Sequence, residues 1–227
     1  MHVGANLACY NFAMQTTLTE QDEIIIDGLA QQGYVVLDNY LSSDEIAPLA
    51  QLAHEKFIQH EMAKAGTGKQ AQTNANIRGD SIHWLDEQST EPAVQRYFSK
   101  MQHLKGLLNQ HFFIGLASLE THLAIYPVGA GYQKHLDQFS LGQSQQLNTR
   151  KLSSILYLNQ NWQTSDGGEL RIYFNDDKWL DISPIGGRLV LFLSAQFWHE
   201  VLPAKRERLS LTGWFRTREF QPIQASG

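Results

Sequence analysis

Several features that define large protein classes are missing from this sequence. Cys9 is the only cysteine, so no disulfide can form within the chain, which is typical of a reducing compartment. The lysines and arginines form no run, and the net charge of −5 argues against binding to nucleic-acid phosphates. No apolar segment approaches the roughly 20 residues that span a bilayer. We therefore expect neither a nucleic-acid partner nor a membrane association.

The amino-terminal residues also lack the basic segment of a signal peptide. The first lysine or arginine is Lys56, and the mildly apolar opening is interrupted by Asn6 and Asn11. A cytoplasmic protein is the resulting prediction. Hydrophobic residues make up 42% of the chain and aromatic residues 11%, which is enough for a large core. At this length we expect a single domain spanning residues 1–227.

The first half of the chain is expected to provide helical support. Thr19 with Asp22 has the pattern of a helix N-cap, and Gly33 is a typical stop, so a helix lies between them. Residues 66–76 are polar, contain glycine and have no periodicity, which predicts a loop. The elements expected within residues 19–119 are a helix 19–33, a strand 34–37, a helix from Ser42 to about Ala63, a strand 77–85 and a helix from Thr90 to about Phe112.

From Glu120 onward, short β-rich segments separated by turn signals replace the helices. Their near-regular spacing over residues 120–216 is typical of a sandwich or jelly roll. The expected strands are 121–126, 132–139, 152–159, 169–174, 179–182, 188–193, 197–202 and 208–215. The predicted fold class is therefore mainly β, with the N-terminal helices supporting the larger sheet.

The motif His135-Leu136-Asp137, followed much later by His199, is the strongest sign of chemistry. Two imidazoles and one carboxylate make the facial set that holds non-haem Fe(II) and leaves coordination positions open. Side chains two apart on a strand point to the same face, so His135 and Asp137 are expected to reach one metal together. His199 has to come from a distant strand. The alternatives are a chance H-x-D pattern and a Zn or Mn site with hydrolase or isomerase chemistry.

An arginine suited to binding a carboxylate follows the second histidine. The segment from Arg208 to Phe215 alternates in hydrophobicity, which predicts a strand with Arg208, Ser210, Thr212 and Trp214 on one face. A planar guanidinium that points into a barrel needs a carboxylate, which it binds through two hydrogen bonds. The sequence offers no acidic partner at a fixed spacing, so we expect the carboxylate to belong to a ligand.

These residues resemble the 2-oxoglutarate- and Fe(II)-dependent dioxygenases, and more narrowly the prolyl hydroxylases of the hypoxia-sensing type and their bacterial relatives. The similarity runs from about Tyr34 to Phe215. It is carried by the segments 76–85, 126–137, 150–159, 162–171, 184–192 and 199–203. It implies that the core is a double-stranded β-helix, the cupin-like jelly roll.

The resemblance also implies roles for individual residues. It implies that His135, Asp137 and His199 bind Fe(II), and that Arg208 grips the distal carboxylate of 2-oxoglutarate. Tyr157 resembles a hydroxyl donor to the same carboxylate. The other implied cosubstrate contacts are Tyr126, Thr212, Leu170 and Trp214, and the implied substrate contacts are Arg78, Trp84 and Arg150.

The resulting hypothesis is an enzyme that uses Fe(II), 2-oxoglutarate and O2, with ascorbate as an accessory reductant. It hydroxylates a prolyl residue of a protein or peptide and releases succinate and CO2. The family's bacterial members suggest a translation factor such as elongation factor Tu as substrate. Residues 66–76 are expected to close over an extended, proline-containing peptide. A hydroxylase of free amino acids or other small molecules and a non-catalytic jelly-roll binding module are the alternatives.

Overall fold

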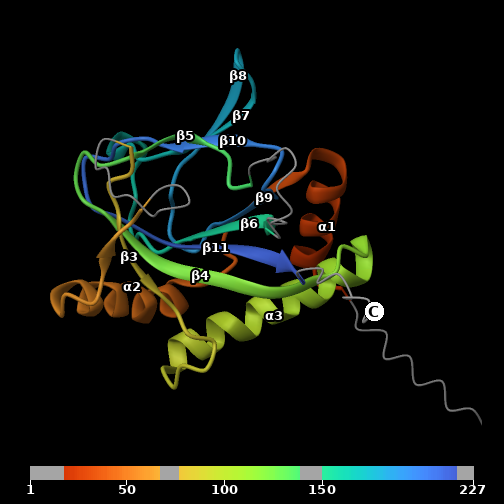
Figure 1. Cartoon of the computed structure of the whole chain (residues 1–227), viewed down its shortest axis with the longest axis horizontal. Coiled ribbons are helices and arrows are strands. Elements are labelled where there is room, and N and C mark those ends of the chain that lie inside the picture. Colours follow the sequence, from red (N-terminus) through yellow and green to blue (C-terminus); the bar gives the residue numbers. More distant parts are fainter. Residues whose placement is uncertain (1–17, 67–76, 139–149, 219–227) are drawn as a thin grey trace, which may run out of the picture.

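Two facing antiparallel β-sheets, with helices packed against one of them, make up the part of the chain that the computed structural model describes, residues 18–66, 77–138 and 150–218 (Figure 1). The larger sheet has the strand order β1-β9-β6-β11-β4-β3-β2, and the smaller sheet has the order β5-β10-β7-β8. The elements are α1 (Glu20–Gln32), β1 (Tyr34–Leu37), α2 (Ser43–Ile58), β2 (Ala63–Lys64), β3 (Ser81–Trp84), α3 (Pro92–Phe112), β4 (Leu116–Tyr126), β5 (Tyr132–His135), β6 (Arg150–Tyr157), β7 (Leu170–Asn175), β8 (Lys178–Ile182), β9 (Leu189–Leu193), β10 (Trp198–Val201) and β11 (Arg208–Thr217).

The larger sheet is buried on both faces, and the alternation of side chains assigns each residue to one of two cores. On β4, Leu123 and Ile125 pack into the core shared with the helices. Ala124 and Tyr126 point the other way, into the core between the two sheets. This two-sided burial explains why the end of β4 is apolar without interruption.

The helices begin and end at residues suited to those positions. Thr19 and Asp22 form a capping box at the start of α1, and Gly33 takes a left-handed conformation, with φ of 75°, at its end. Pro92 occupies the first turn of α3, where its missing N–H costs nothing. As Figure 1 shows, α2 and α3 lie along the outer face of the larger sheet.

Several predicted boundaries are wrong; three of the larger differences lie before residue 121, and the strand expected over 132–139 ends at His135. The helix expected to reach Ala63 ends at Ile58, because His60 turns the chain with a φ of 59° and the following residues form β2. The strand expected from residue 77 begins at Ser81, although Arg78 still bridges to Tyr132. The long pairing of β4 with β11 extends β4 back to Leu116, before the expected start at residue 121.

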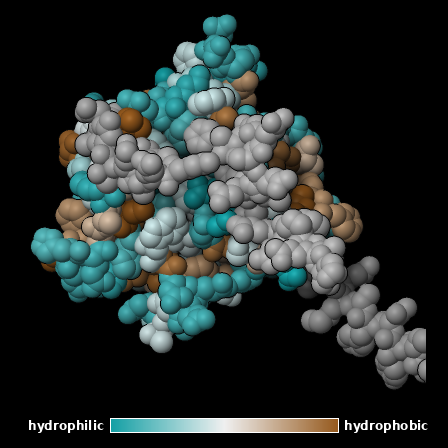
Figure 2. Space-filling view, in the orientation of Figure 1, coloured by the Kyte–Doolittle hydropathy of each residue, from teal (hydrophilic) through white to brown (hydrophobic). Residues whose placement is uncertain are grey.

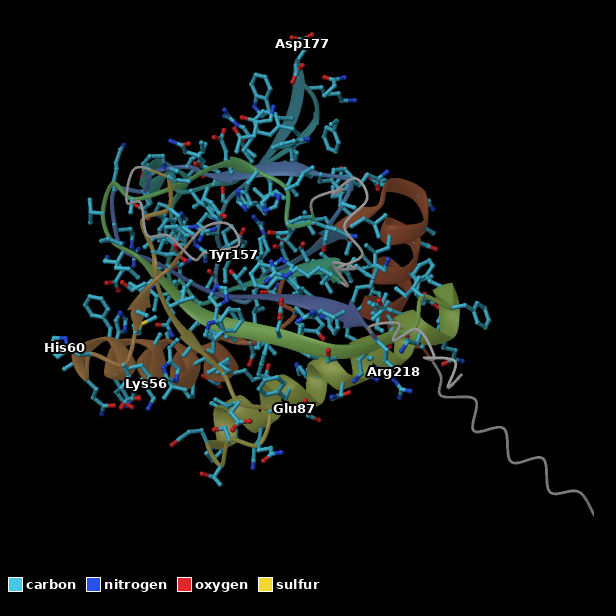
Figure 3. The ribbon with its side chains drawn as sticks, viewed as in Figure 1. Lys56, His60, Glu87, Tyr157, Asp177 and Arg218 are labelled. Carbon is cyan, nitrogen blue, oxygen red and sulfur yellow. The ribbon has the colours of Figure 1, made fainter. Side chains whose placement is uncertain are left out.

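On the face of the molecule that Figure 2 shows, the projecting parts of the fold are mainly polar. In Figure 2 hydrophilic residues cover the outer side of α2 and the projecting β7–β8 hairpin. None of the helices in the described ranges combines the length and apolar character that a bilayer crossing requires. Figure 3 places Asp177 at the tip of that hairpin and Tyr157 in the interior between the sheets. Cys9 and residues 67–76 of the expected loop lie outside the described residues.

Candidate metal centre

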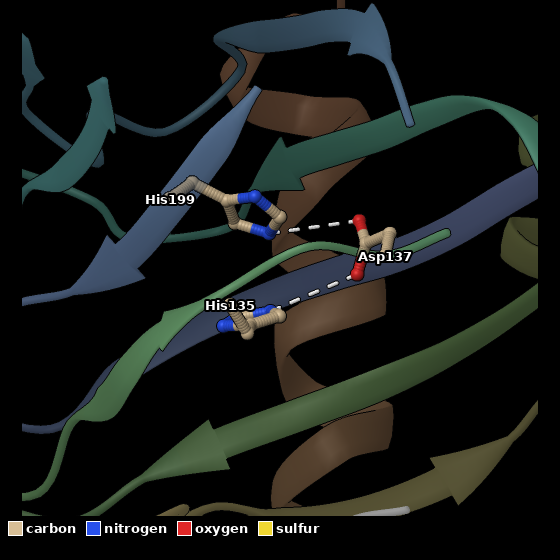
Figure 4. A group of neighbouring side chains, drawn as sticks. All are labelled: His135, Asp137 and His199. Carbon is tan, nitrogen blue, oxygen red and sulfur yellow. Dashed lines mark ion pairs between the residues drawn. The ribbon is translucent and has the colours of Figure 1, made fainter. Parts of the chain in front are cut away.

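Three side chains from the smaller sheet and the turn beside it converge in the interior (Figure 4). His135 ends β5 and stands directly opposite His199 on β10, with ring centroids 4.2 Å apart. Nε2 of His135 lies 3.7 Å from Oδ1 of Asp137, and Nε2 of His199 lies 3.6 Å from Oδ2. Ligand atoms about 2.1 Å from a shared ion stand roughly 3–3.5 Å apart, so this donor set fits one metal ion.

Asp137 is not on the same strand as His135, contrary to the sequence expectation. Strand β5 ends at His135, and Asp137 lies in the bend that follows. Other contacts therefore place its carboxylate. The backbone N–H of Gln138 donates to the carbonyl of Ser194 at 3.2 Å, and the hydroxyl of Ser153 donates to Oδ2 of Asp137 at 2.6 Å. The conclusion that the two ligands reach one metal stands, but the strand periodicity is not its cause.

Backbone carbonyls set the tautomer of both histidines. Nδ1 of His135 lies 2.7 Å from the carbonyl oxygen of Gln133, and Nδ1 of His199 lies 3.0 Å from that of Phe197. A carbonyl only accepts, so each Nδ1 carries the proton and each Nε2 keeps a lone pair for a metal. The sequence could not identify these acceptors. Each is a backbone oxygen two residues before its histidine.

The electrostatics keep His135 and Asp137 in their metal-binding protonation states. Burial, reinforced by the neighbouring His199, lowers the pKa of His135 to about 3, so this imidazole is neutral at pH 7. Burial works to raise the pKa of Asp137, but the two imidazoles and the hydroxyl of Ser153 outweigh it and hold the pKa below its usual value. A neutral imidazole and an ionised carboxylate are the forms that bind a divalent cation.

Arg208 is a buried cation with no acidic partner in the described ranges. It is 1% exposed, and its Nε donates to the carbonyl of Gly168 at 2.9 Å. Its guanidinium carbon lies 5.2 Å from the ring of Tyr126 and 5.0 Å from the ring of Tyr157. Gly168 has a φ of 73°, and a Cβ there would stand 2.8 Å from Ala204, so glycine lets this carbonyl approach the arginine.

The hydroxyl of Tyr157 adds a second unsatisfied group beside Arg208. It is buried and makes no hydrogen bond of good geometry within the described residues. Burial raises the pKa of Tyr157, although the charge of Arg208 opposes the shift, so the hydroxyl stays protonated and can donate. A guanidinium without an acidic partner in the described ranges, beside a hydroxyl that makes no hydrogen bond of good geometry there, is suited to a carboxylate ligand.

The other predicted cosubstrate contacts divide between two places. Tyr126 and Leu170 belong to the same inner core as Tyr157. Thr212 lies midway along β11, its hydroxyl 3.3 Å from that of Ser210. Trp214 is six residues from Arg208, or about 20 Å along an extended strand. The cosubstrate contacts of these residues stay predictions. The distance of Trp214 from Arg208 along β11 favours a role for Trp214 near the metal.

Two of the three predicted substrate residues, Trp84 and Arg150, meet around Trp214. The guanidinium carbon of Arg150 lies 3.7 Å from the Trp214 ring, and the ring of Trp84 lies 6.4 Å from it. The indole N–H of Trp214 lies near Asp137 and helps to lower its pKa, without meeting full hydrogen-bond geometry. Trp84 is 50% exposed, so this group of side chains connects the metal centre with the surface. Their contact with substrate stays a prediction.

Arg78 is tied to a residue that the sequence analysis did not single out. Its guanidinium donates to both carboxylate oxygens of Asp80, at 2.7 and 2.9 Å, and its carbon lies 4.8 Å from the Tyr132 ring. Asp80 is fully buried. The ring of Tyr132 in turn stacks on His135 with centroids 3.6 Å apart. Arg78 thus helps to position His135 through Tyr132. The two-residue spacing of Arg78 and Asp80 is the feature of the sequence that could have predicted their ion pair.

Comparison with known proteins agrees with this geometry. Residues 121–216 match the model of the 2OG-Fe(II) oxygenase superfamily. A prolyl-4-hydroxylase of Pseudomonas putida is 41% identical, with a TM-score of 0.77, and the match covers 87% of this chain and 99% of that one. A prolyl hydroxylase of Trichoplax adhaerens, solved with a hypoxia-inducible-factor oxygen-degradation-domain peptide, is 26% identical with a TM-score of 0.76, covering 86% and 89% of the two chains.

A longer relative shows the same similarity. The hypoxia-inducible factor prolyl hydroxylase of Caenorhabditis elegans is 32% identical over 89% of this chain, and this chain spans 29% of that protein's length. The fold and the His–Asp–His site define a 2-oxoglutarate- and Fe(II)-dependent dioxygenase. Within that superfamily the chain belongs to the prolyl 4-hydroxylase family.

Proposed function

We propose that this protein hydroxylates a prolyl residue of a protein substrate, coupled to conversion of 2-oxoglutarate and O2 to succinate and CO2. The observation that carries the cosubstrate assignment is Arg208, a 1% exposed cation without an acidic partner in the described ranges. Fe(II) held by the triad would supply the chemistry of oxidative decarboxylation and of oxygen insertion into a C–H bond.

The residues around the metal contribute orientation and a dry environment. His135, Asp137 and His199 would hold the ion with three protein ligands, which leaves coordination positions for 2-oxoglutarate and O2. Arg208 and the hydroxyl of Tyr157 bind the distal carboxylate and so fix the direction of the cosubstrate. Ascorbate belongs to this proposal as an accessory reductant.

A protein substrate is supported by the side chains at the surface end of the site. Trp84 is half-exposed, and Arg150 lies over Trp214, so aromatic faces and a cation line the approach to the metal. The Trichoplax relative was solved with a peptide fragment of the hypoxia-inducible-factor oxygen degradation domain. Elongation factor Tu is the candidate that we propose to test first.

The test is an oxygen-transfer assay with a protein extract. The metal-free enzyme is loaded anaerobically with Fe(II) and 2-oxoglutarate, mixed with elongation factor Tu or a bacterial extract, and exposed to air. Mass spectrometry should find a gain of one oxygen atom on proline in a protein. If succinate forms and only a free amino acid gains oxygen, the protein-substrate proposal is wrong. If no succinate forms at all, the assignment of the cosubstrate is wrong.

A further inference from the structure

His122 is a buried imidazole on the inner face of β4, outside the metal triad. It is two residues before Ala124 and four before Tyr126, both of which face the core between the sheets. It stands opposite Thr212 on β11 and is 1% exposed. It is not among the residues that the sequence predicts for the site, yet the fold places it on the face of the sheet that carries Ala124 and Tyr126.

One ring nitrogen of His122 has a partner, and that partner fixes the tautomer. Nε2 lies 3.5 Å from Nη2 of Arg78, whose guanidinium is held by Asp80. A guanidinium has donors only, so Nε2 must accept. Burial, with the charges of Arg78 and Arg150, lowers the pKa of His122 to about 3. The ring is therefore neutral at pH 7, and its single proton is on Nδ1.

The Nδ1–H of His122 is then a buried donor without an acceptor among the described residues. Buried N–H groups are nearly always hydrogen-bonded, because desolvation without a partner is costly. Two indoles fix the ring in place, with centroids 4.8 Å away for Trp84 and 5.6 Å away for Trp214. A fixed ring with one unused donor is arranged to receive an oxygen atom.

Its position separates this donor from the cosubstrate carboxylate. Tyr126, which contacts Arg208, is four residues further along β4, or about 13 Å along the strand. Of the two indoles that contact His122, Trp84 is 50% exposed and Trp214 is 5% exposed, so the approach to His122 runs beside Trp84. The acceptor therefore comes from the substrate side.

We propose that His122 is a specificity-determining residue that donates its Nδ1–H to a backbone carbonyl oxygen of the prolyl substrate. The inference rests on the proposed function. The peptide bond before a proline has a carbonyl but no N–H, so it offers an acceptor and no donor. A neutral imidazole that presents only an N–H donor can bind this carbonyl oxygen. The same imidazole offers no acceptor to the N–H of an ordinary amide.

The kinetic test compares three variants with elongation factor Tu, or whichever extract protein gains oxygen, as substrate. His122→Met removes the donor and should raise KM for the protein roughly 10-fold. Succinate formation without protein substrate should change less than about 2-fold. His122→Gln keeps a side-chain N–H and should recover most of the loss. His111→Gln, an exposed position on α3, should behave as wild type.

Specific outcomes overturn the inference. Equal losses in protein hydroxylation and uncoupled succinate formation would mean that His122 supports the fold or the metal. Wild-type hydroxylation by His122→Met would remove His122 from substrate recognition while leaving the proposed function in place. If wild-type enzyme forms succinate but hydroxylates no protein, both the proposed protein substrate and the role of His122 are wrong. The failure of the His122 proposal alone is therefore distinguishable from the failure of the proposed function.

A spectroscopic readout tests the tautomer without any substrate. In Zn(II)-loaded protein with 15N-labelled histidine, the Nδ1 of His122 should show the shift of a protonated nitrogen, and His122→Gln assigns the signal by its loss. The Nδ1 signal should remain unchanged from pH 8 to pH 6. A ring protonated on Nε2, or on both nitrogens, would overturn the proposal, because Nδ1–H would then not be the free donor.

Discussion

Ser153 donates a hydrogen bond of 2.6 Å to Oδ2 of Asp137, and this contact positions the carboxylate, which strand pairing does not. Asp137 lies beyond the last residue of β5, so the β-ladder does not fix its side chain. The carboxylate can only accept, so the hydroxyl of Ser153 is committed to it and accepts in turn from Ser194 at 2.9 Å. Both serines are buried, which keeps water from competing for these bonds.

The first prediction is that Ser153→Ala weakens metal binding by roughly 10- to 100-fold, the usual effect of losing a group that orients a ligand. Titration of the metal-free protein with Co(II), followed by visible absorption, measures the affinity without turnover. Ser153→Thr keeps the hydroxyl and should restore most of the affinity.

Ser154→Ala is the matched control for this measurement. Ser154 is the next residue on β6, is equally buried and has an unpartnered hydroxyl, but it faces the helices with Leu156. Its removal should leave Co(II) affinity unchanged. Wild-type affinity in both alanine variants would mean that the hydroxyl of Ser153 does not orient Asp137.

The second prediction is that His199→Ala abolishes Fe(II) binding and turnover while the fold remains. One of three ligands is lost, and no other imidazole of the described residues belongs to this group of ligand atoms. Wild-type protein should gain thermal stability when a divalent metal and 2-oxoglutarate are added, because ligands stabilise the folded state. The variant should show a cooperative melt with no such gain. Full turnover in the variant would contradict the triad.

The strands of the jelly roll could be predicted from the sequence because the alternation of side chains along a strand depends only on neighbouring residues. The expected strand 208–215 corresponds to β11, which extends two residues further to Thr217, and Arg208 and Trp214 are buried as their shared face requires. The residue at which strand pairing stops depends instead on the partner strand, which is distant in the sequence. Strand β5 ends at His135 because that residue forms the last pair with His199 on β10, and alternation alone cannot show this.

The missed residues have the same explanation. His122 and Ser153 act through contacts with residues far away in the sequence, as in the pair of Ser153 with Ser194, which are 41 positions apart. Such partners become visible only when the sheet register is known. The metal motif was readable because its residue types are rare together, whereas a single serine or histidine on a strand is common.

The third prediction concerns acid stability of the metal-free protein. The pKa of His122 is about 3 in the fold and close to 6.5 in an unfolded chain. Between these values the unfolded state binds one more proton, so the free energy of unfolding falls as pH falls, by up to about 1.4 kcal/mol per pH unit from this group. Urea unfolding at pH 7, 6 and 5 should show a shallower loss in His122→Met. An identical pH dependence in both proteins would mean that His122 is not buried in its neutral form.

The last prediction is that Arg208→Lys raises the 2-oxoglutarate requirement sharply. Two charge-assisted hydrogen bonds to a carboxylate contribute about 1.5–3 kcal/mol, or roughly 10- to 100-fold in affinity. An ammonium keeps the charge of Arg208 but cannot copy the planar fork, and its shorter reach leaves the carbonyl of Gly168 without its donor. Succinate formation against 2-oxoglutarate concentration should therefore show a raised KM, with kcat largely regained at saturation. Arg96→Lys, an exposed position on α3, is the control for the same exchange away from the site. If the Arg208 variant keeps the wild-type dependence on 2-oxoglutarate, the buried guanidinium does not bind the cosubstrate.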